Sequence, residues 1–307
     1  MVKLEEAILK PKNYSLEKDG ITQSLISNFM SCRVKGMLSL NRWSNGSKNK
    51  TVNFGSLVHH ILENVYGVKK IPDMPAIEKM IDAFETKVKP EQKEHDNALA
   101  SAIIEGYLEY YKDELKTLKF VRTEGEIDVI VDGVRRRGKI DAECIDKLKR
   151  NWLMETKTKG QIQEDSMMKI MAFDFQNLFY LTNYEYQTGK KVRGTYYNVI
   201  RKPQHKIKAG ESLREFKDRL LEIIRKDPGH FYKRYEIVYT NMDKEKHINN
   251  CKGKLDDIKS WINDPDKIYR NEFSCKQGNF ECEYLDACST GNMGGYTRTK
   301  KLFEELS

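Results

Sequence analysis

The sequence predicts an α/β domain in which helices flank a small, mixed central sheet. Apolar residues recur at helical spacing over most of residues 22–118, whereas alternating apolar and polar residues at 121–131 are typical of a half-buried strand. Strand-like and helix-like segments then alternate as far as residue 263, which is the pattern of a sheet covered by helices. With 307 residues, the chain is long enough to bury a large core.

The individual elements follow from these two periodicities. Thr22 suits the N-cap of the first helix, and Asp132-Gly133 is a strong signal for a hairpin. Helices are expected at about 22–40, around His59, and at about 76–89, 91–118, 166–186, 212–226 and 241–263. Strands are expected at about 121–131, 138–143, 153–157, 191–200 and 235–240, and the tail that follows is expected to be irregular.

The composition favours a soluble protein with a polyanionic partner. Charged residues make up 33% of the chain, mean hydropathy is −0.71, and no apolar run is long enough to span a bilayer. The N-terminus lacks the apolar core of a signal peptide, so a cytoplasmic location is expected. Lysine and arginine exceed aspartate and glutamate by 54 − 46 = 8. The basic run Arg135, Arg136 and Arg137 would either hold phosphates or form a solvated face.

Two strand-like segments place two acids and a lysine side by side. The first contains Asp141; in the second, Glu155 and Lys157 project to the same side because alternate residues of a strand share a face. The polar residues 146–150 between the segments suit an antiparallel hairpin, and a turn centred on Leu148 pairs Asp141 with Glu155. Two facing carboxylates repel unless a cation lies between them, and a divalent metal is the simplest such cation.

This pattern, an aspartate followed by Glu-x-Lys, resembles the PD-(D/E)XK nuclease superfamily, and further motifs resemble its RecB-like branch. Gly55 to His59 resembles the G-x-x-x-H helix of that branch, and Gln176 to Tyr180 its Q-x-x-x-Y motif. The resemblance covers the chain from about Thr22 to the C-terminus. It implies a restriction-endonuclease-like core with a helical insertion, flanked by N- and C-terminal segments that cysteines staple together.

The resemblance further implies one nuclease domain over residues 1–307. Its parts would be a helical N-terminal part at 22–118, a catalytic core at 119–240, and a C-terminal helix with a cysteine-rich tail at 241–307. Glu124 and Glu126 precede the catalytic hairpin, and the sequence does not choose which of them adds a further carboxylate.

The candidate metal is Mg²⁺ or Mn²⁺. Asp141 and Glu155 supply hard oxygen ligands, and His59 adds a nitrogen, which Mn²⁺ tolerates better than Mg²⁺. Gly55, His59 and Glu63 share one helix face at spacings of four residues, a relation that the neighbouring His60 lacks. The family also implies a metal contact from the backbone carbonyl of Thr156.

The remaining site residues act on the phosphate and the DNA. Lys157 would orient the attacking water and stabilise the anionic charge that develops during phosphodiester hydrolysis. Gln176 and Tyr180 lie one helical turn apart, and in the family these residues border the active site and the DNA path. Tyr180 would otherwise be a core residue among its phenylalanine neighbours.

Six cysteines in an intracellular chain indicate thiols or metal ligands rather than disulfides. Four of them resemble the ligands of the iron–sulfur cluster in AddB-type and CRISPR-adaptation nucleases: Cys32, Cys275, Cys282 and Cys288. Four thiolates suit a 4Fe-4S cluster, and they also suit zinc or remain simple thiols. Cys144 and Cys251 are expected to be structural.

The function that follows is a Mg²⁺- or Mn²⁺-dependent DNA exonuclease or end-processing nuclease in recombination, replication or genome processing. Its partner would be DNA, single-stranded or with duplex ends, together with recombination, replication or CRISPR-adaptation proteins. Phage-type stand-alone nucleases are slightly favoured, and a phage-encoded chain would act in the host cytoplasm. Two alternatives stay open: a catalytically silent nucleic-acid-binding subunit, and an RNA nuclease.

Overall fold

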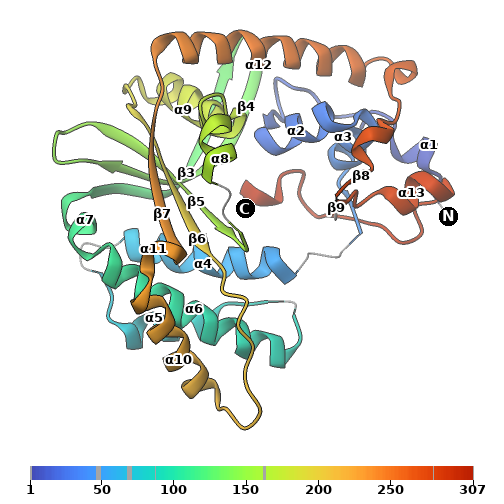
Figure 1. Ribbon diagram of the computed structural model, residues 1–307. Coiled ribbons are helices and arrows are strands. Elements are labelled where there is room, and N and C mark those ends of the chain that lie inside the picture. The colour runs from blue at the N-terminus through green and yellow to red at the C-terminus, as the bar shows by residue number, and fades with distance from the viewer. Residues whose placement is uncertain are drawn as a thin grey trace.

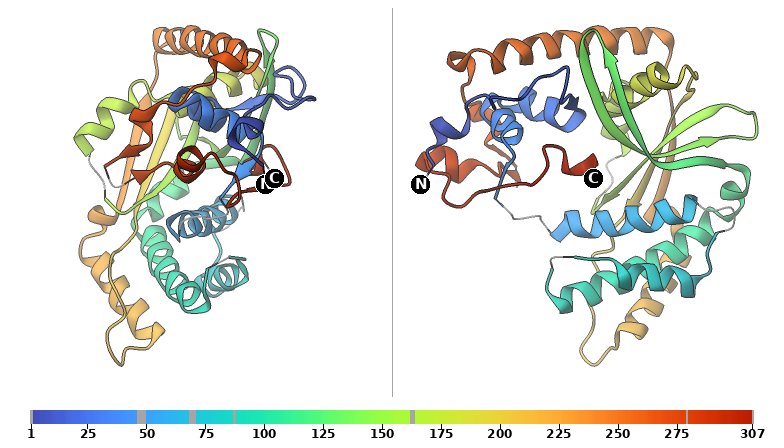
Figure 2. Two further views of the ribbon diagram at one scale, coloured as in Figure 1. Left: turned by 90° about the vertical axis from the view of Figure 1, so that its right-hand side faces the viewer. Right: turned by 180° about the vertical axis from the view of Figure 1, so that it is seen from behind.

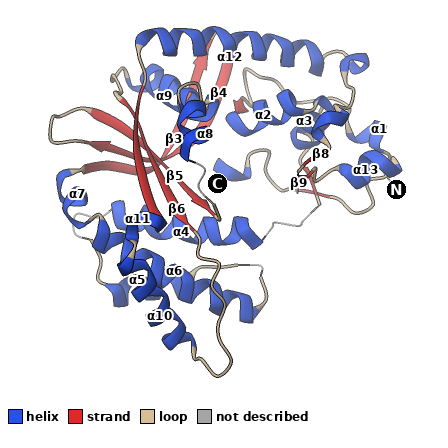
Figure 3. Cartoon of the chain, in the orientation of Figure 1, coloured by secondary structure: helices blue, strands red, loops and turns tan. Residues whose placement is uncertain are grey.

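A six-stranded mixed sheet forms the centre of the protein, in a computed structural model that describes residues 2–45, 50–67, 71–86, 88–161, 164–278 and 280–306 (Figures 1 and 3). The order is β1-β4-β5-β6-β7, with β3 also pairing β4. Only β1–β4 and β5–β6 are parallel pairs. The strands are β1 (Ile21–Thr22), β3 (Lys119–Val131), β4 (Val134–Ile145), β5 (Asn151–Lys159), β6 (Gly194–Arg201) and β7 (Tyr232–Val238). The predicted α/β class is confirmed.

Two hairpins fix the register around β4. The β3–β4 turn uses Asp132 and Gly133, with φ of 52° and 73°, as the two-residue signal predicts. In the β4–β5 hairpin, Ala142 lies opposite Met154 and Ile145 opposite Asn151. This is the register of the predicted turn centred on Leu148, so the prediction is confirmed.

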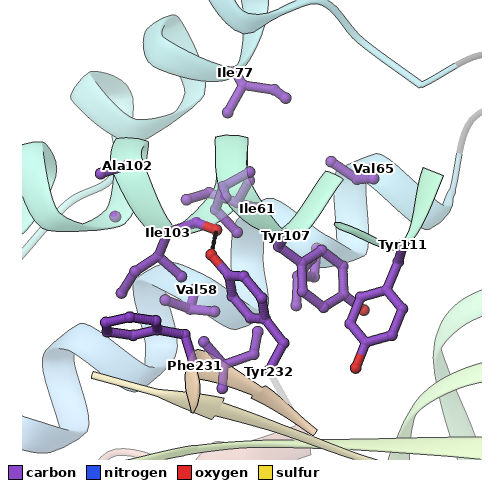
Figure 4. Close-up of a cluster of buried hydrophobic side chains, with 14 of the residues drawn as sticks. Val58, Ile61, Val65, Ile77, Ala102, Ile103, Tyr107, Tyr111, Phe231 and Tyr232 are labelled. Carbon is purple, nitrogen blue, oxygen red and sulfur yellow. Dashed lines mark hydrogen bonds between the residues drawn. The ribbon is translucent and has the colours of Figure 1, made fainter. Parts of the chain in front are cut away.

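Helices cover both faces of the sheet. One face carries α4 (Lys50–Tyr66), α5 (Met74–Ala83), α6 (Pro90–Tyr110), α7 (Lys112–Thr117), α10 (Leu213–Lys226) and α11 (Pro228–Phe231), whose apolar side chains form a large core with β4–β6 (Figure 4). The other face carries α8 (Glu164–Met171) and α9 (Phe175–Thr188), and α12 (Asn241–Ile262) packs on α9. Figure 1 shows α12 running along the top of the molecule, well away from α10.

Three of the expected helices are each divided into two. Residues 22–40 form α2 (Gln23–Ser31) and α3 (Arg33–Leu40), because Cys32 between them is extended, with φ of −162°. The expected helix 166–186 is broken after Met171, since Asp174 caps a new helix by accepting a hydrogen bond from the backbone N–H of Asn177. The expected helix 91–118 ends at Tyr110 and α7 follows.

The two ends of the chain build a second lobe together. The N–H of Leu4 donates to the carbonyl of Gly291, and the N–H of Met293 donates to that of Val2. Figures 1 and 2 show the N-terminal and C-terminal segments side by side. The short elements of this lobe are α1 (Leu4–Ala7), β2 (Trp43–Ser44), η1 (Pro265–Lys267), η2 (Glu272–Ser274), β8 (Lys276–Gln277), β9 (Phe280–Glu281), α13 (Leu285–Thr290) and β10 (Thr297–Arg298). The chain then returns to the central sheet, where η3 (Glu304–Leu306) contacts β4. No helix in the described ranges has the length and apolarity to cross a membrane.

Candidate active site

The open end of the β4–β5 hairpin brings the two predicted acids together. The ladder between these strands ends at Ala142 and Met154, so Asp141 and Glu155 are the next residues on each strand. Asp141 accepts a hydrogen bond of 2.6 Å from the backbone N–H of Thr156. The acids therefore flank the point where β4 and β5 separate.

Helix α9 supplies an amide that links Glu155 to Lys157. The Gln176 side chain donates to Glu155 Oε1 at 2.7 Å and accepts from Lys157 Nζ at 3.3 Å. Lys157 also forms an ion pair with Glu155. A primary amide both donates and accepts, which allows it to hold an acid and an ammonium group at the same time.

Helix α4 approaches from the other side and contributes His59, whose Nδ1 lies 3.5 Å from Asp141 Oδ2. Gly55 permits this approach, since a Cβ there would lie only 3.0 Å from the Thr158 hydroxyl oxygen. One cavity of about 830 Å³ is lined by His59, both acids, Lys157, Gln176 and Tyr180. Thus α4, α9 and the hairpin bring most of the predicted catalytic residues to one cavity.

Burial and neighbouring charges shift the pKa values of all four ionisable groups in this cluster. Burial raises the pKa of Glu155 to about 7, and the charge of Asp141 adds to the rise. Burial opposes ionisation of Asp141 as well, but the charge and hydrogen bond of His59 lower its pKa. The acids raise the pKa values of His59 and Lys157 against the effect of burial. The two acids therefore repel each other even though His59 and Lys157 lie beside them.

A hard divalent cation fits this donor set. Asp141 and Glu155 present oxygens to the cavity and His59 an imidazole nitrogen, and a cation there would offset the repulsion between the two carboxylates. Within the described ranges, no three His, Cys, Asp or Glu side chains are already arranged to hold a metal ion. The side chains instead bond one another, His59 to Asp141 and Lys157 to Glu155.

Three acidic or basic neighbours refine the predicted site. Glu124 lines the cavity and pairs with Lys139, whereas Glu126 is not among the lining residues, so Glu124 is the one placed to add a further carboxylate. Lys139 was not a predicted site residue, although its position two residues before Asp141 on β4 places it on the same strand face. His60 also lines the cavity, but His59 is the histidine paired with Asp141.

Tyr180 lies against β4 at the edge of the cavity. A Cβ on Gly138 would come within 2.6 Å of the Tyr180 ring, so glycine is required for this contact. The Tyr180 ring also packs against two separate clusters of buried hydrophobic side chains. Tyr180 therefore has the core role and the cavity-lining position that the sequence left as alternatives.

The three arginines before Asp141 occupy different environments. Arg136 is 1% exposed, so its guanidinium, which donates a 3.4 Å hydrogen bond to Asn183, is not accessible to a phosphate. Arg135 makes two hydrogen bonds to Asp128, and Arg137 Nε lies 3.8 Å from the same carboxylate. Alternation along β4 turns Arg136 inward, which a run of three identical residues does not reveal.

Four cysteines from the two chain ends lie in the second lobe, although within the described ranges no three of them are arranged to hold a metal ion. The backbone N–H of Asn271 points to the sulfur of Cys32 at 3.4 Å, and the N–H of Cys282 donates to the carbonyl of Cys275. Burial raises the pKa of Cys288 to about 11, and the nearby charges of the other three thiolates add to the rise. The remaining cysteines, Cys144 and Cys251, are fully buried in hydrophobic clusters.

Comparison with known proteins gives a family and a fold. The family model of the PD-(D/E)XK nuclease superfamily matches residues 21–289. A crystal structure of a presumed exonuclease from Eubacterium rectale is similar, with a TM-score of 0.51 and 15% identity over 91% of each chain. At that identity the likeness concerns the fold. No curated protein matches the chain.

Proposed function

The chain belongs to the PD-(D/E)XK nuclease superfamily, and from that premise we propose that it is a divalent-metal-dependent nuclease that hydrolyses DNA from its ends. The observation that carries the proposal is the convergence of Asp141, Glu155 and Lys157 on a single cavity, where burial and the charge of Asp141 raise the pKa of Glu155. The proposal takes residues 1–307 as one nuclease domain with its catalytic core at 119–240. Its place in the RecB-like branch rests on the order of the motifs.

Asp141, Glu155 and His59 would hold Mg²⁺ or Mn²⁺, with the carbonyl of Thr156 as a further contact. The ion, when bound, neutralises phosphate charge and lowers the pKa of water. The protein's own contribution is to fix the acids: Thr156 N–H holds Asp141, and the Gln176 amide holds Glu155. Glu155 is only 5% exposed, and this burial strengthens the hydrogen bond that it accepts from Gln176.

Lys157 acts on the reacting phosphate. Its ammonium group lines the cavity beside Glu155 and is held there by Gln176, so it is oriented before the substrate arrives. A fixed ammonium at this position stabilises the negative charge that grows on the phosphate oxygens and orients the attacking water. Because Gln176 contacts both Glu155 and Lys157, it sets the spacing between them.

Basic residues beside the cavity would bind the DNA backbone. Lys139 lines the cavity, and Arg135 and Arg137 are partly exposed on the same strand. We leave Arg136 out of this surface because it is buried. These contacts are to phosphates, so they favour nucleic acid without reading its sequence.

The deciding experiment compares end-labelled linear DNA, closed circular DNA and linear RNA. Each is incubated with the purified protein and Mg²⁺ or Mn²⁺, with EDTA as the control. Degradation of linear DNA alone is expected. Cleavage of circles would make the enzyme an endonuclease, a preference for RNA would favour the RNA nuclease, and binding without cleavage would favour the silent subunit.

A second part of the proposal concerns Cys32, Cys275, Cys282 and Cys288. Their approach from segments more than two hundred residues apart favours a shared 4Fe-4S cluster, which would staple the two chain ends. Anaerobically purified protein should then be brown with broad absorbance near 400 nm, a feature of thiolate-bound iron. Serine at any of the four positions should bleach it, whereas Cys144→Ser should not. Zinc in place of iron, or neither metal, would contradict the cluster.

The biological setting in this proposal is recombination, replication, genome processing or CRISPR adaptation, in the cytoplasm or in that of a phage's host. It rests on the resemblance of the motifs. Co-purification of the tagged full chain with a helicase or an adaptation integrase, lost when the second lobe is altered, would support a protein partner.

A further inference from the structure

A row of three polar side chains crosses the sheet behind the catalytic strand. Thr156 on β5 lies opposite Asn198 on β6, and Asn198 lies opposite Arg234 on β7. Thr156 is 2% exposed and Asn198 fully buried, and the Arg234 side chain is 4% exposed. Their face of the sheet is opposite that of Glu155 and Lys157, because side chains alternate along β5.

The row is joined by hydrogen bonds. The Asn198 amide donates to the Thr156 hydroxyl at 3.4 Å and accepts from Arg234 Nε at 3.4 Å. The same amide donates to the Tyr107 hydroxyl at 3.1 Å, and Arg234 also donates to that hydroxyl. The far end is fixed by Glu114, which accepts from the Arg234 guanidinium at 2.8 Å.

These polar groups lie against the largest hydrophobic core, where they are costly unless they are paired. The guanidinium of Arg234 stacks 4.0 Å from the centre of the Tyr111 ring, so it has no exit to water on that side. A shift in register of β5 against β6, or of β6 against β7, would separate donors from acceptors in this apolar setting. The row therefore fixes the relative position of three strands.

The part of β5 that carries the catalytic residues depends on this fixing. The β4 ladder stops at Met154, whereas the β6 ladder continues through Glu155 and Lys157 to Lys159. Beyond Met154, the described contacts join β5 to β4 through the hydrogen bond from Thr156 N–H to Asp141. Thr156 thus connects the row, through its hydroxyl, to the acid of the active site, through its amide.

We propose that Asn198 and Arg234 are positioning residues that act through Thr156 to set the distance between Asp141 and Glu155. The inference rests on the proposed nuclease activity. It assigns the buried row to the geometry of the acid pair, and so predicts that changes in the row lower metal affinity and turnover in addition to any effect on folding.

The test compares Thr156→Val, which removes the hydroxyl at nearly constant shape, with Thr156→Ser, which keeps it. Asn198→Leu removes the middle of the row. Tyr232→Phe is the matched control, since it deletes a buried hydroxyl of the same core that donates to the Ile103 carbonyl rather than to Thr156, Asn198 or Arg234 (Figure 4). For each variant, the measurements are Mn²⁺ affinity by electron paramagnetic resonance without DNA, kcat and KM on linear DNA, and Tm.

Thr156→Val and Asn198→Leu should weaken Mn²⁺ binding several-fold and lower kcat about 10–100-fold at saturating Mn²⁺, the usual result of sub-ångström to ångström misplacement. KM for DNA should stay unchanged, and Thr156→Ser should restore both values. Tyr232→Phe should lower Tm while leaving Mn²⁺ affinity and kcat unchanged. Equal kinetic losses in Tyr232→Phe, or unchanged Mn²⁺ affinity in both Thr156→Val and Asn198→Leu, would overturn the inference.

This design distinguishes failure of the proposed nuclease function from failure of the proposed role of the buried row. A wild-type protein that binds Mn²⁺ but cleaves no DNA overturns the nuclease function, and the Mn²⁺ titration still tests the row. A wild-type protein that does neither overturns both.

Discussion

The two ends of the β4–β5 hairpin carry acids with opposite properties. At the turn, Asp146 accepts hydrogen bonds from the backbone N–H groups of Leu148 and Arg150, from the Arg150 guanidinium and from the indole of Trp152. These bonds outweigh burial and hold the pKa of Asp146 at about 2. At the open end, burial and a neighbouring carboxylate raise the pKa of Glu155 to about 7.

The difference separates stability from function within one hairpin. The Asp146 carboxylate has its partners in the protein, so it stabilises the fold. At the open end, Asp141 is paired with His59 and Glu155 with Lys157, yet burial and the charge of Asp141 still raise the pKa of Glu155. The pair is therefore a site of electrostatic repulsion that a bound cation would relieve. Strongly shifted acids of this second kind are typical of functional sites.

The largest expected effect is on activity at the open end. Asp141→Ala and Glu155→Ala should each lower cleavage by about 10³-fold or more, because each removes a metal ligand. Lys157→Ala should lower kcat by about 10²–10³-fold through loss of charge stabilisation. The measurement is kcat on linear DNA with Mn²⁺, with circular dichroism and DNA binding as controls. Full activity of a purified Glu155→Ala protein would contradict the mechanism.

Removal of the repulsion should also leave the metal-free fold at least as stable. Glu155→Gln keeps an acceptor for Gln176 and removes the charge, so its Tm in EDTA should equal or exceed that of the wild type. A clear loss of Tm would show that Glu155 belongs with Asp146 as a structural acid.

Loss of the acid at the turn should lower stability and leave activity unchanged. Asp146→Ala leaves the buried Trp152 indole and two backbone N–H groups without their acceptor, at a cost of about 2–3 kcal/mol in the free energy of unfolding. Urea unfolding measures this, and kcat per folded molecule should be unchanged. Lys147→Ala, on the exposed side of the same turn, is the matched control and should be neutral. Equal stability of Asp146→Ala and Lys147→Ala would refute the assignment.

A smaller effect is expected at His59. His59→Ala should raise the Mn²⁺ concentration for half-maximal activity about tenfold, the usual scale for a supporting ligand, with little change in DNA affinity. His60→Ala is the control, because its ring lies against Phe84 rather than beside Asp141. A greater loss in His60→Ala would exchange the roles of the two histidines.

The smallest expected effect is a pH dependence of thermal stability in acid. Asp146 has a folded pKa below its ordinary value, so its contribution to stability is present above about pH 4 and is lost as the pH falls towards 2. The difference in Tm between wild type and Asp146→Asn should therefore shrink across that range. A constant difference would mean that the hydrogen bonds at the turn do not depend on ionisation of Asp146.

The predictable parts of this protein are those set by near neighbours in sequence. The opposition of Asp141 and Glu155 follows from a turn of five residues, and Thr22 caps its helix as expected. The placement of His59 and Gln176 came from a family resemblance, since no local rule joins either of them to the hairpin.

The unpredicted parts depend on residues far apart in sequence. Arg136 turned out to be buried because α9 covers its strand, and the row from Thr156 to Arg234 requires the order of three strands. The break after Met171 is a local feature that was missed, although Asp174 is a favourable N-cap residue. Helical periodicity across 166–186 concealed it.

The joining of the two chain ends has a consequence for biosynthesis. The N–H of Leu4 donates a hydrogen bond to Gly291, so this contact cannot form until 291 − 4 = 287 further residues have been synthesised. At about 5–20 residues per second this takes roughly 15–60 s. All strands of the central sheet are therefore synthesised before the second lobe can close. Cys32 therefore leaves the ribosome long before Cys288, and its thiol is exposed to oxidants and chaperones for most of translation.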